Sequence, residues 1–467
     1  MLFNLHKVYI QAIEELERKE FDFIIIGSGP AGITLCNEIL KKKKKNILII
    51  EKGDLLKRRA EKIFHKFLPI KLNSRVFGVG GTSNAWSNVS STFEKFEMEQ
   101  RWEKKNINLW PLSFAKLKYF YNKIDKNYKF NYEDLKKNKT NLPFELRKFY
   151  GSNKPANFKD YILYNKISLL YNCEELTVDE IKKKSFVIFK YQNQLKQIFG
   201  KKIIICAGGI ESTALVLRSL QKKQLNGIKN KKLVGSYFMD HPKFFLGYLK
   251  YPKIDLIKNF FIKKSKDMFY YTGVSLNKNT QRNKKILNSY VRFEYEKLYF
   301  NFKKKNLILS NIAKFLYYKI FNSKKFTPNI RIRAFSEMVP RASNKILVSK
   351  KDQKIFVNYK MCAKSIKTLR YLSTYIYKYF SNYPEKEFVN KITKKFLYNN
   401  IEDASHHMGG LIYSKDIRKS IVDKNLKIIG TNKIFVCSSA VFPTSGSVNP
   451  TMTICALAVR LANHLVK

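Results

Sequence analysis

The chain has 467 residues, and 90 Lys and Arg face 36 Asp and Glu, which gives a formal net charge of +54. This length allows a large core and is typical of two domains. A basic excess of this size can indicate a nucleic-acid partner. The lysines are spread along the whole chain without any nucleic-acid motif, so we expect no such partner and attribute the charge to compositional bias.

The six cysteines are scattered without a C-x-x-C pair, and most lie in apolar stretches. We therefore expect no disulfide framework, no metal site and a reducing compartment. The first 20 residues lack the apolar core of a signal peptide, and no apolar run is long enough for a transmembrane segment. These features predict a cytoplasmic protein. The basic amphipathic stretch 306–326 leaves peripheral membrane contact open, although a domain helix with a solvated lysine face is the favoured interpretation.

After a short amphipathic helix in residues 1–20, the apolar run 21–26 predicts a buried parallel strand. It leads into Gly27-Ser28-Gly29-Pro30-Ala31-Gly32 and a helical pattern. A second apolar strand, 46–50, ends in Glu51. Residues 53–74 are basic and irregular.

The order strand, glycine turn, helix, strand and acid predicts a dinucleotide site. Gly27 allows the tight turn, Gly29 lets the backbone approach a pyrophosphate, and Gly32 lets helix and strand pack closely. The helix N-terminus stabilises phosphate charge. Glu51 follows Gly27 by 24 residues and can accept hydrogen bonds from a ribose diol. The candidate cofactor-binding residues in this segment are Gly27, Ser28, Gly29, Ala31, Gly32 and Glu51.

A second glycine-rich segment follows at 78–84, where backbone N–H and hydroxyl groups fit a loop pressed against a ligand. An ordinary glycine-rich turn is the alternative. The candidates here are Gly80, Gly81, Thr82, Ser83 and Asn84.

Trp110-Pro111-Leu112-Ser113 predicts the start of a helix over 114–128, and residues 130–160 are polar and loop-rich. Short apolar stretches from 167 to 199 indicate small antiparallel strands. Another buried strand, 202–206, enters Ala207-Gly208-Gly209 and a helix over 211–220. This repeats the strand–glycine–helix geometry and returns the chain to the first sheet.

Residues 245–400 have a different pattern. The segments 291–296 and 330–334 alternate apolar and charged residues, which is typical of an antiparallel sheet with one wet face. A short strand at 345–349 and helices near 362–380 and 385–397 follow. We interpret this stretch as a second domain inserted into the first.

The C-terminal segment carries Ser405-His406-His407-Met408-Gly409-Gly410, a strand at 434–436 and a helix that ends near Leu465. Asn449 suits the N-cap of that helix, and Pro450 suits its first position.

Taken in order, the motifs resemble the glucose–methanol–choline (GMC) oxidoreductases, flavoenzymes that oxidise alcohols, and most closely their bacterial sugar and polyol branch. The motifs are GSGPAG, FGVGGTSNAW, WPLS, CAGGIESTALVLRS, VGSYFMDHP, SEMVPRASNKILVS, HHMGG and FVCSSAVFPTSGSVNPTMTICALAVRLANHL. The resemblance implies an α/β, Rossmann-like FAD-binding domain of the GMC/PHBH type with an inserted α+β substrate domain on an antiparallel sheet. We expect residues 1–110, 165–245 and 400–467 to hold FAD, and residues 111–164 and 246–399 to form the substrate domain.

The family pattern also implies catalytic roles. It places a base at His406 and its partner at Asn449, beside the flavin N5 atom that accepts hydride. A free imidazole has a pKa of about 6.5 and can act as a base at neutral pH. His407 as the base and Asn449 as a helix cap alone remain alternatives, and His241 is expected to be structural. Further cofactor contacts are expected from Ala207, Gly208, Pro450 and Thr451, the last two at a helix N-terminus facing the flavin.

The sequence departs from the family pattern at two places. Gly410 stands where relatives usually have Thr, and the Arg that follows in many of them is missing, so the substrate preference is open. Ala85 stands where some relatives attach FAD through His, so we expect non-covalent FAD.

The predicted function is oxidation of a CH–OH group in a sugar, polyol or other alcohol by hydride transfer to flavin. Oxygen, a quinone or a cytochrome could accept the electrons. A flavin-dependent carbon–carbon desaturase or reductase, or a non-catalytic basic flavoprotein, is the alternative function.

Overall fold

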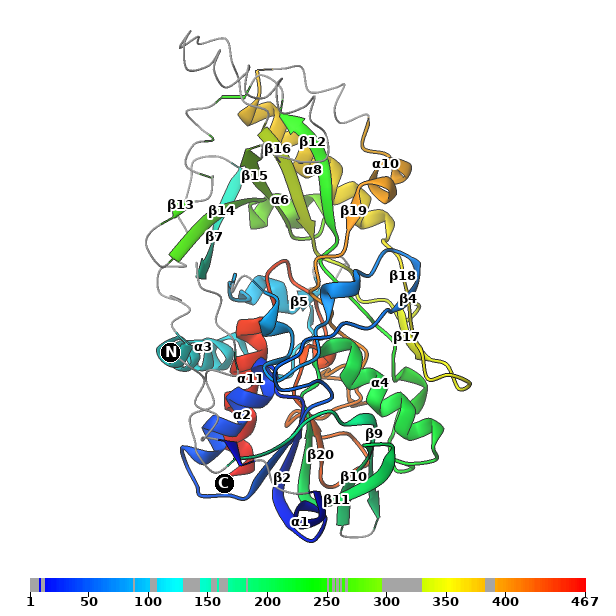
Figure 1. Cartoon of the computed structure of the whole chain (residues 1–467). Helices are drawn as coiled ribbons and strands as arrows, with labels where there is room; N and C mark the ends of the chain where they lie inside the picture. The colour runs from blue at the N-terminus through cyan, green and yellow to red at the C-terminus, as the bar shows by residue number, and fades with distance from the viewer. Residues whose placement is uncertain are drawn as a thin grey trace, which may run out of the picture.

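The computed structural model describes residues 8–9, 13–86, 89–100, 107–128, 143–152, 158, 167–181, 184–249, 252–253, 257, 260, 263–264, 268–295, 330–382 and 391–467. Figure 1 shows two main sheets, one at each end of the molecule, with the C-terminal helix between them. The basic stretch 306–326 lies outside the described residues. Within them, no helix is long and apolar enough to cross a membrane.

The centre of the first sheet is parallel, with the strand order β8, β3, β2, β11. β20 is a further parallel partner of β11. The apolar runs predicted as buried strands form β2 and β3, whose pairing is parallel and whose apolar side chains are buried. Both predictions are confirmed. These central strands are β2 (Glu20–Ile26), β3 (Ile47–Ile50), β8 (Ile167–Leu170), β11 (Gln194–Ile205) and β20 (Ile434–Val436).

Two antiparallel strands extend this sheet. β9 (Glu174–Ile181) pairs with β10 (Lys184–Tyr191), which pairs with the first half of β11, as the alternating pattern predicted. At the other edge, β1 (Val8–Tyr9) pairs with β8. The predicted N-terminal helix is therefore wrong at this point, because the open sheet edge offers hydrogen bonds to two residues of high strand propensity. Within the described part of residues 1–20, only α1 (Ile13–Glu17) is helical.

Helices cover the parallel strands. α2 (Pro30–Leu40) packs against α11 (Thr451–Leu465), which also contacts α3 (Phe114–Tyr128). α3 has the bounds that the sequence predicted. α4 (Gly208–Gln221) follows β11 and contacts β9. Segments from both ends of the chain therefore lie side by side beneath the second sheet (Figure 1).

The second sheet is antiparallel, with the order β13, β14, β15, β16, β12, β19 and with β7 pairing β14. α8 (Ala363–Phe380) packs against β15 and β16. The predicted antiparallel strands are confirmed. The exact domain limits stay a prediction. The strands are β7 (Phe144–Ser152), β12 (Lys243–Leu249), β13 (Lys263–Lys264), β14 (Met268–Leu276), β15 (Ser289–Tyr295), β16 (Ile330–Ser336) and β19 (Ile401–Glu402).

β7 lies in the stretch predicted to be loop-rich, so that prediction is wrong for residues 144–152. The sequence did not predict this strand because Arg147 takes a buried position on the same face as Phe149. A charged side chain in the core breaks the two-residue apolar period from which strands are predicted.

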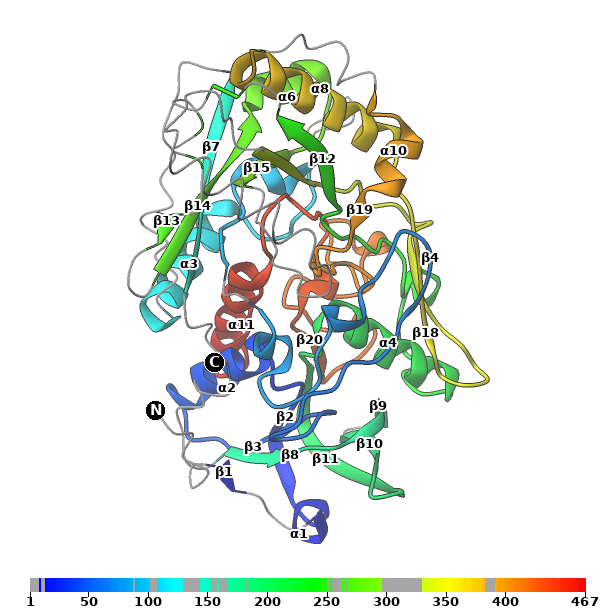
Figure 2. The same ribbon diagram turned by 45° about the horizontal axis from the view of Figure 1, so that its top comes forward.

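A small third sheet joins β17 (Lys345–Val348), β18 (Ile355–Tyr359) and β4 (Phe64–Phe67). The strand predicted at 345–349 is confirmed. β4 corrects the irregular structure predicted for 53–74, because its exposed side chains carry little apolar pattern. Figure 2 shows this sheet along one side of the molecule. The remaining short elements are α6 (Lys278–Lys284), α10 (Lys394–Asn399), β5 (Glu99–Gln100) and β6 (Ile107–Asn108).

Candidate active site

A cavity of about 840 Å³ opens at the carboxyl ends of β2 and β3 and extends to the loop before α11. Carboxyl ends of parallel strands are where α/β sheets bind nucleotides. Most of the predicted site residues border it: Gly27, Gly29, Ala31, Glu51, Gly81, Thr82, Ser83, Ala207, Gly208, His406, Asn449, Pro450 and Thr451. Four predicted residues do not border it: Ser28, Gly32, Gly80 and Asn84.

The three fingerprint glycines have different surroundings. Gly27 has φ +103°, and a Cβ there would lie 2.8 Å from the Cys206 carbonyl oxygen. A Cβ on Gly32 would lie 2.0 Å from the Gly27 carbonyl oxygen, so only glycine allows α2 to pack this close. A Cβ on Gly29 would meet nothing nearer than Gly81 Cα at 3.9 Å. Gly29 thus offers bare backbone to the cavity at the N-terminus of α2.

Glu51 is buried and holds the turn in place. Its Oε2 accepts hydrogen bonds from Ser28 N at 3.0 Å and Ser28 Oγ at 2.7 Å, and its Oε1 accepts one from Gly53 N at 2.9 Å. A carboxylate has about four acceptor positions. About one therefore remains for a ribose hydroxyl, and Ser28 acts from outside the cavity by orienting this carboxylate.

Side chains of the glycine-rich loop mainly shape the loop itself. Asn84 donates to the carbonyl oxygens of Val79 and Gly81, and Ser83 Oγ donates to the Gly80 carbonyl at 2.6 Å. The loop therefore presents backbone and Thr82 to the cavity rather than the Asn84 amide.

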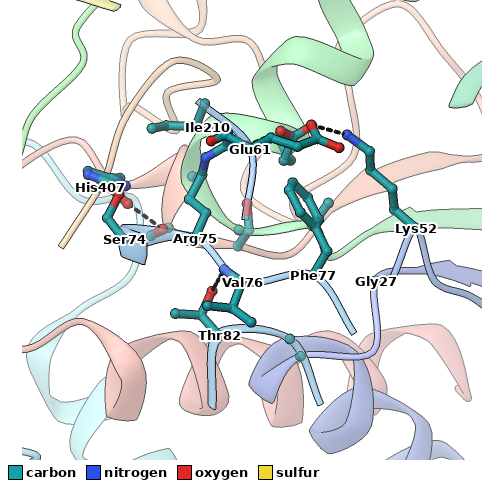
Figure 3. Close-up of a pocket in the computed structure, with 18 of the residues that line it drawn as sticks. Gly27, Lys52, Glu61, Ser74, Arg75, Val76, Phe77, Thr82, Ile210 and His407 are labelled. Carbon is teal, nitrogen blue, oxygen red and sulfur yellow. Dashed lines mark hydrogen bonds and ion pairs between the residues drawn. The ribbon is translucent and has the colours of Figure 1, made fainter. Parts of the chain in front are cut away.

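Charged pairs form one wall of the cavity, and the sequence did not reveal them. Arg75 pairs with Glu211 at the start of α4. Lys52 Nζ lies 2.6 Å from Glu61 Oε2, and Figure 3 shows this pair beside Arg75. Burial alone would raise the pKa of Glu211, but Arg75 and Lys52 outweigh it and lower that pKa to about 2. The only sequence signal was that Arg75 and Glu211 each stand beside a glycine motif.

His406 contacts two polar side chains at the other end of the cavity. Its Nε2 lies 3.0 Å from Asn449 Nδ2, and its Nδ1 lies 3.0 Å from Nδ1 of His241. Nε2 of His241 lies 2.8 Å from the Ser445 carbonyl oxygen. Sequence reasoning assigned His241 no role beyond structure, because a single His between Asp and Pro carries no spacing signal.

Asn449 does not cap α11, which corrects one expectation. The helix begins at Thr451 with Pro450 at the N-cap position and without a side-chain cap. Asn449 Oδ1 is buried and has no hydrogen-bond partner among the described residues. The proline allows the turn without a cap and leaves the Asn449 amide for the cavity.

Backbone pairing brings the two histidine segments together. Met239 and Met408 exchange two hydrogen bonds of 2.8 Å in an isolated antiparallel bridge. The buried Asp240 carboxylate accepts from the backbone N–H of His406 at 2.9 Å and of Ala404 at 3.1 Å. His241 and His406 are therefore positioned by the chain on both sides.

The adjacent histidines have opposite electrostatics. Burial, then His241, holds the pKa of His406 well below its usual value. Burial also opposes the charged form of His407, but Asp403, 3.2 Å away, raises the pKa of His407. His406 is thus a neutral imidazole beside the cavity at neutral pH, whereas Asp403 favours the protonated form of His407.

Gly410, the departure from the family pattern, has a packing reason. It has φ +103°, and a Cβ there would lie 2.3 Å from Thr213 Oγ1 of α4. Thr213 fills the space that a larger residue at 410 would need.

The fold is α/β, with a cavity at the carboxyl ends of the parallel strands and an antiparallel second sheet. Residues 339–458 match the family model described as GMC oxidoreductase. This C-terminal part of the chain is therefore similar to GMC oxidoreductases.

The chain is also similar to a curated protein and to solved structures. The large subunit of fructose dehydrogenase from Gluconobacter japonicus is 25% identical over 291 residues, covering 58% of this chain and 48% of that protein. This chain thus matches about half the length of that relative. Among solved structures, pyridoxine 4-oxidase from Mesorbium loti has a TM-score of 0.60 at 11% identity, covering 95% and 99% of the two chains. Formate oxidase from Aspergillus oryzae RIB40 has a TM-score of 0.59 at 14% identity, covering 96% and 98%. At these identities the structures show a shared fold.

GMC oxidoreductases are FAD-binding flavoproteins, and the cavity fits FAD. The open backbone at Gly29, the remaining acceptor position of Glu51 and the N-terminus of α2 suit its phosphates and ribose. Oδ1 of Asn449 is buried and has no hydrogen-bond partner within the part of the chain that the structure describes.

Proposed function

We propose that this protein is an FAD-dependent oxidoreductase that oxidises a CH–OH group of a sugar, polyol or related alcohol. The observation that carries the proposal is the pair formed by His406 Nε2 and Asn449 Nδ2, 3.0 Å apart, at the end of the cavity away from the dinucleotide turn. The fructose dehydrogenase relative supports the substrate class.

His406 is the proposed base. Its neutral Nε2 is an acceptor, and a substrate hydroxyl that competes with Asn449 for this atom can give it the proton. Asn449 Nδ2 then donates to the substrate oxygen and orients it. A bound FAD would supply the acceptor for the two electrons and the hydrogen of the carbinol carbon.

The remaining assignments belong to the same proposal. FAD is held without a covalent bond, since Ala85 borders the cavity where some relatives have the attaching His. All six cysteines are free thiols, as in a reducing compartment such as the cytoplasm. Oxygen, a quinone or a cytochrome takes the electrons onward.

The test is anaerobic bleaching of the FAD-loaded protein by a panel of sugars, polyols and simple alcohols. His406→Asn should lower the rate of bleaching about 10²- to 10⁴-fold, the usual contribution of a general base, while FAD stays bound. His464→Asn, at an exposed position, is the matched control and should bleach like the parent protein. Rapid bleaching of the His406→Asn protein would refute the role of the base. No bleaching of the parent by any alcohol would favour the desaturase or the non-catalytic alternative.

A further inference from the structure

His241 contacts the proposed base but does not border the cavity. It is fully buried. Its Nδ1 lies 3.0 Å from His406 Nδ1, its Nε2 lies 2.8 Å from the Ser445 carbonyl oxygen, and the Gly446 backbone also interacts with the ring. Its ring meets that of His406 edge to face, with centroids 5.2 Å apart. It therefore acts on a substrate only through His406.

The chain of hydrogen bonds permits one arrangement of protons for two neutral rings. A carbonyl oxygen only accepts, so Nε2 of His241 must carry the proton that it donates to Ser445. Its Nδ1 is then an acceptor. The proton between the two rings must therefore sit on Nδ1 of His406, which leaves Nε2 of His406 unprotonated.

The other end of the chain agrees with this arrangement. An unprotonated Nε2 requires a donor, and Asn449 directs Nδ2 at it. Both rings are neutral at pH 7, because burial lowers the pKa of His241 to about 4 and holds that of His406 well below its usual value.

We propose that His241 is a positioning residue that fixes the tautomer of His406, so that the lone pair on Nε2 faces the cavity. The Ser445 carbonyl sets the tautomer of His241, and His241 transmits it to His406. When the base takes the hydroxyl proton of an alcohol at Nε2, the resulting imidazolium keeps its Nδ1–H bonded to the neutral Nδ1 of His241, which stabilises the new charge. The expected effect on the rate of alcohol oxidation rests on the proposed function, whereas the tautomer assigned to His406 does not.

Two substitutions separate this role from simple packing. His241→Leu fills similar space without an acceptor, so the proton on Nδ1 of His406 loses its partner and the other tautomer becomes accessible. His241→Asn places an amide oxygen near the position of the lost Nδ1 and should keep the parent tautomer. His65→Leu, at an exposed position of β4, is the control for loss of one imidazole.

The primary measurement is nitrogen NMR of the full FAD-loaded chain with ¹⁵N-labelled histidine. With six histidines, the resonances of His406 can be assigned from their loss in His406→Asn. We expect a protonated Nδ1 and a bare Nε2 in the parent, His241→Asn and His65→Leu proteins. We expect a mixed or reversed pattern in His241→Leu. A parent spectrum with the proton on Nε2, or an unchanged tautomer in a folded His241→Leu protein, overturns the proposal.

The second measurement is the steady-state kinetics of the His241 variants. With an alcohol that bleaches the flavin, His241→Leu should lower kcat roughly tenfold or more with little change in KM, and His241→Asn should recover most of it. Equal losses in both variants would overturn the positioning role. If the tautomers behave as expected but His406→Asn has no effect on bleaching, the proposed function fails and the tautomer assignment stands. If His241→Leu does not fold, the parent and His241→Asn spectra decide.

Discussion

At the scale of single residues, His406 and His407 show how one backbone step separates two chemical roles. The His406 side chain contacts Asn449 and His241, whereas the His407 side chain contacts Asp403. The family spacing in the sequence limited the candidates for the proposed base to these two residues. It could not identify Asp403 and His241 as the side chains that distinguish them, because both partners lie outside the motif.

The lowered pKa of His406 predicts the pH dependence of catalysis. A base must be unprotonated, so activity should fall only when the pH drops through a pKa below the usual value of about 6.5. The measurement is kcat at saturating substrate from about pH 5 to 8, in a range where the parent protein stays folded. An acidic limb at or above about pH 6.5 would contradict this environment for His406.

Asn449 provides a second prediction at this scale. Asn449→Ala removes the proposed donor to the substrate oxygen, so kcat/KM should fall about 10- to 100-fold. FAD affinity, measured by fluorescence titration of the apoprotein, should change much less because the substitution leaves the proposed contacts at Gly29 and Glu51 intact. Unchanged kcat/KM would show that the amide does not contact substrate.

At the scale of elements, the loop before α11 holds both Ser445 and Asn449, and a buried ion pair anchors it. Glu97 accepts from the backbone N–H of Ser447 at 2.8 Å and forms a bidentate pair with Arg147 of β7 at 2.8 and 2.9 Å. Burial would raise the pKa of Glu97, but Arg147 outweighs it and lowers that pKa to about 2. The second sheet thus fixes the loop that carries the site.

Removal of this anchor should cost both stability and activity. Glu97→Gln removes the fully buried carboxylate that pairs with Arg147 and leaves it with the more distant Glu94, at 3.3 Å, so the free energy of unfolding should fall by about 3 kcal/mol at pH 7 in urea denaturation. The difference in the free energy of unfolding between the parent and Glu97→Gln should shrink as the pH falls from about 4.3, the pKa of Glu97 in the unfolded chain, toward about 2. The carboxylate of the parent becomes protonated over this range. Asp352→Asn, which removes an ion pair with Lys354 in which both side chains are exposed, is the control and should lower the free energy of unfolding far less. A similar loss in both variants would argue against the anchor.

Elements with a regular apolar period were predictable, and those that depend on tertiary pairing were not. β2, β3 and α3 follow from patterns within their own residues. β7 and β4 were missed because Arg147 occupies a core position in the first and the second has an exposed face. In the site, the glycine turn was predictable from local geometry, whereas the Arg75–Glu211 pair joins residues 136 positions apart and leaves no local signal.

At the scale of the whole molecule, the cavity is lined by segments that are far apart in the sequence. Among them are the turn after β2, the start of α4 and the loop before α11. A ligand that bridges them should stabilise the native state by mass action, by about 2.7 kcal/mol at a concentration 100 times Kd. We therefore expect the Tm of the apoprotein to rise with added FAD and less with AMP, which reaches only one end of the cavity. Equal effects of FAD and AMP would place the binding energy in the nucleotide turn alone.

The mode of attachment is tested on the same preparation. With Ala85 in the cavity wall, acid denaturation should release all flavin into the supernatant. Flavin that sediments with the polypeptide would contradict non-covalent binding.

The pairing of β20 with β11 and of α11 with α2 has a consequence for biosynthesis. On the ribosome, the glycine turn near residue 27 emerges hundreds of residues before Asn449 and the helix that follows it. The cavity is therefore incomplete in the nascent chain until α11 has packed against α2. Flavin capture should be a late event, and a translation pause before residue 434 should yield chains that do not retain FAD.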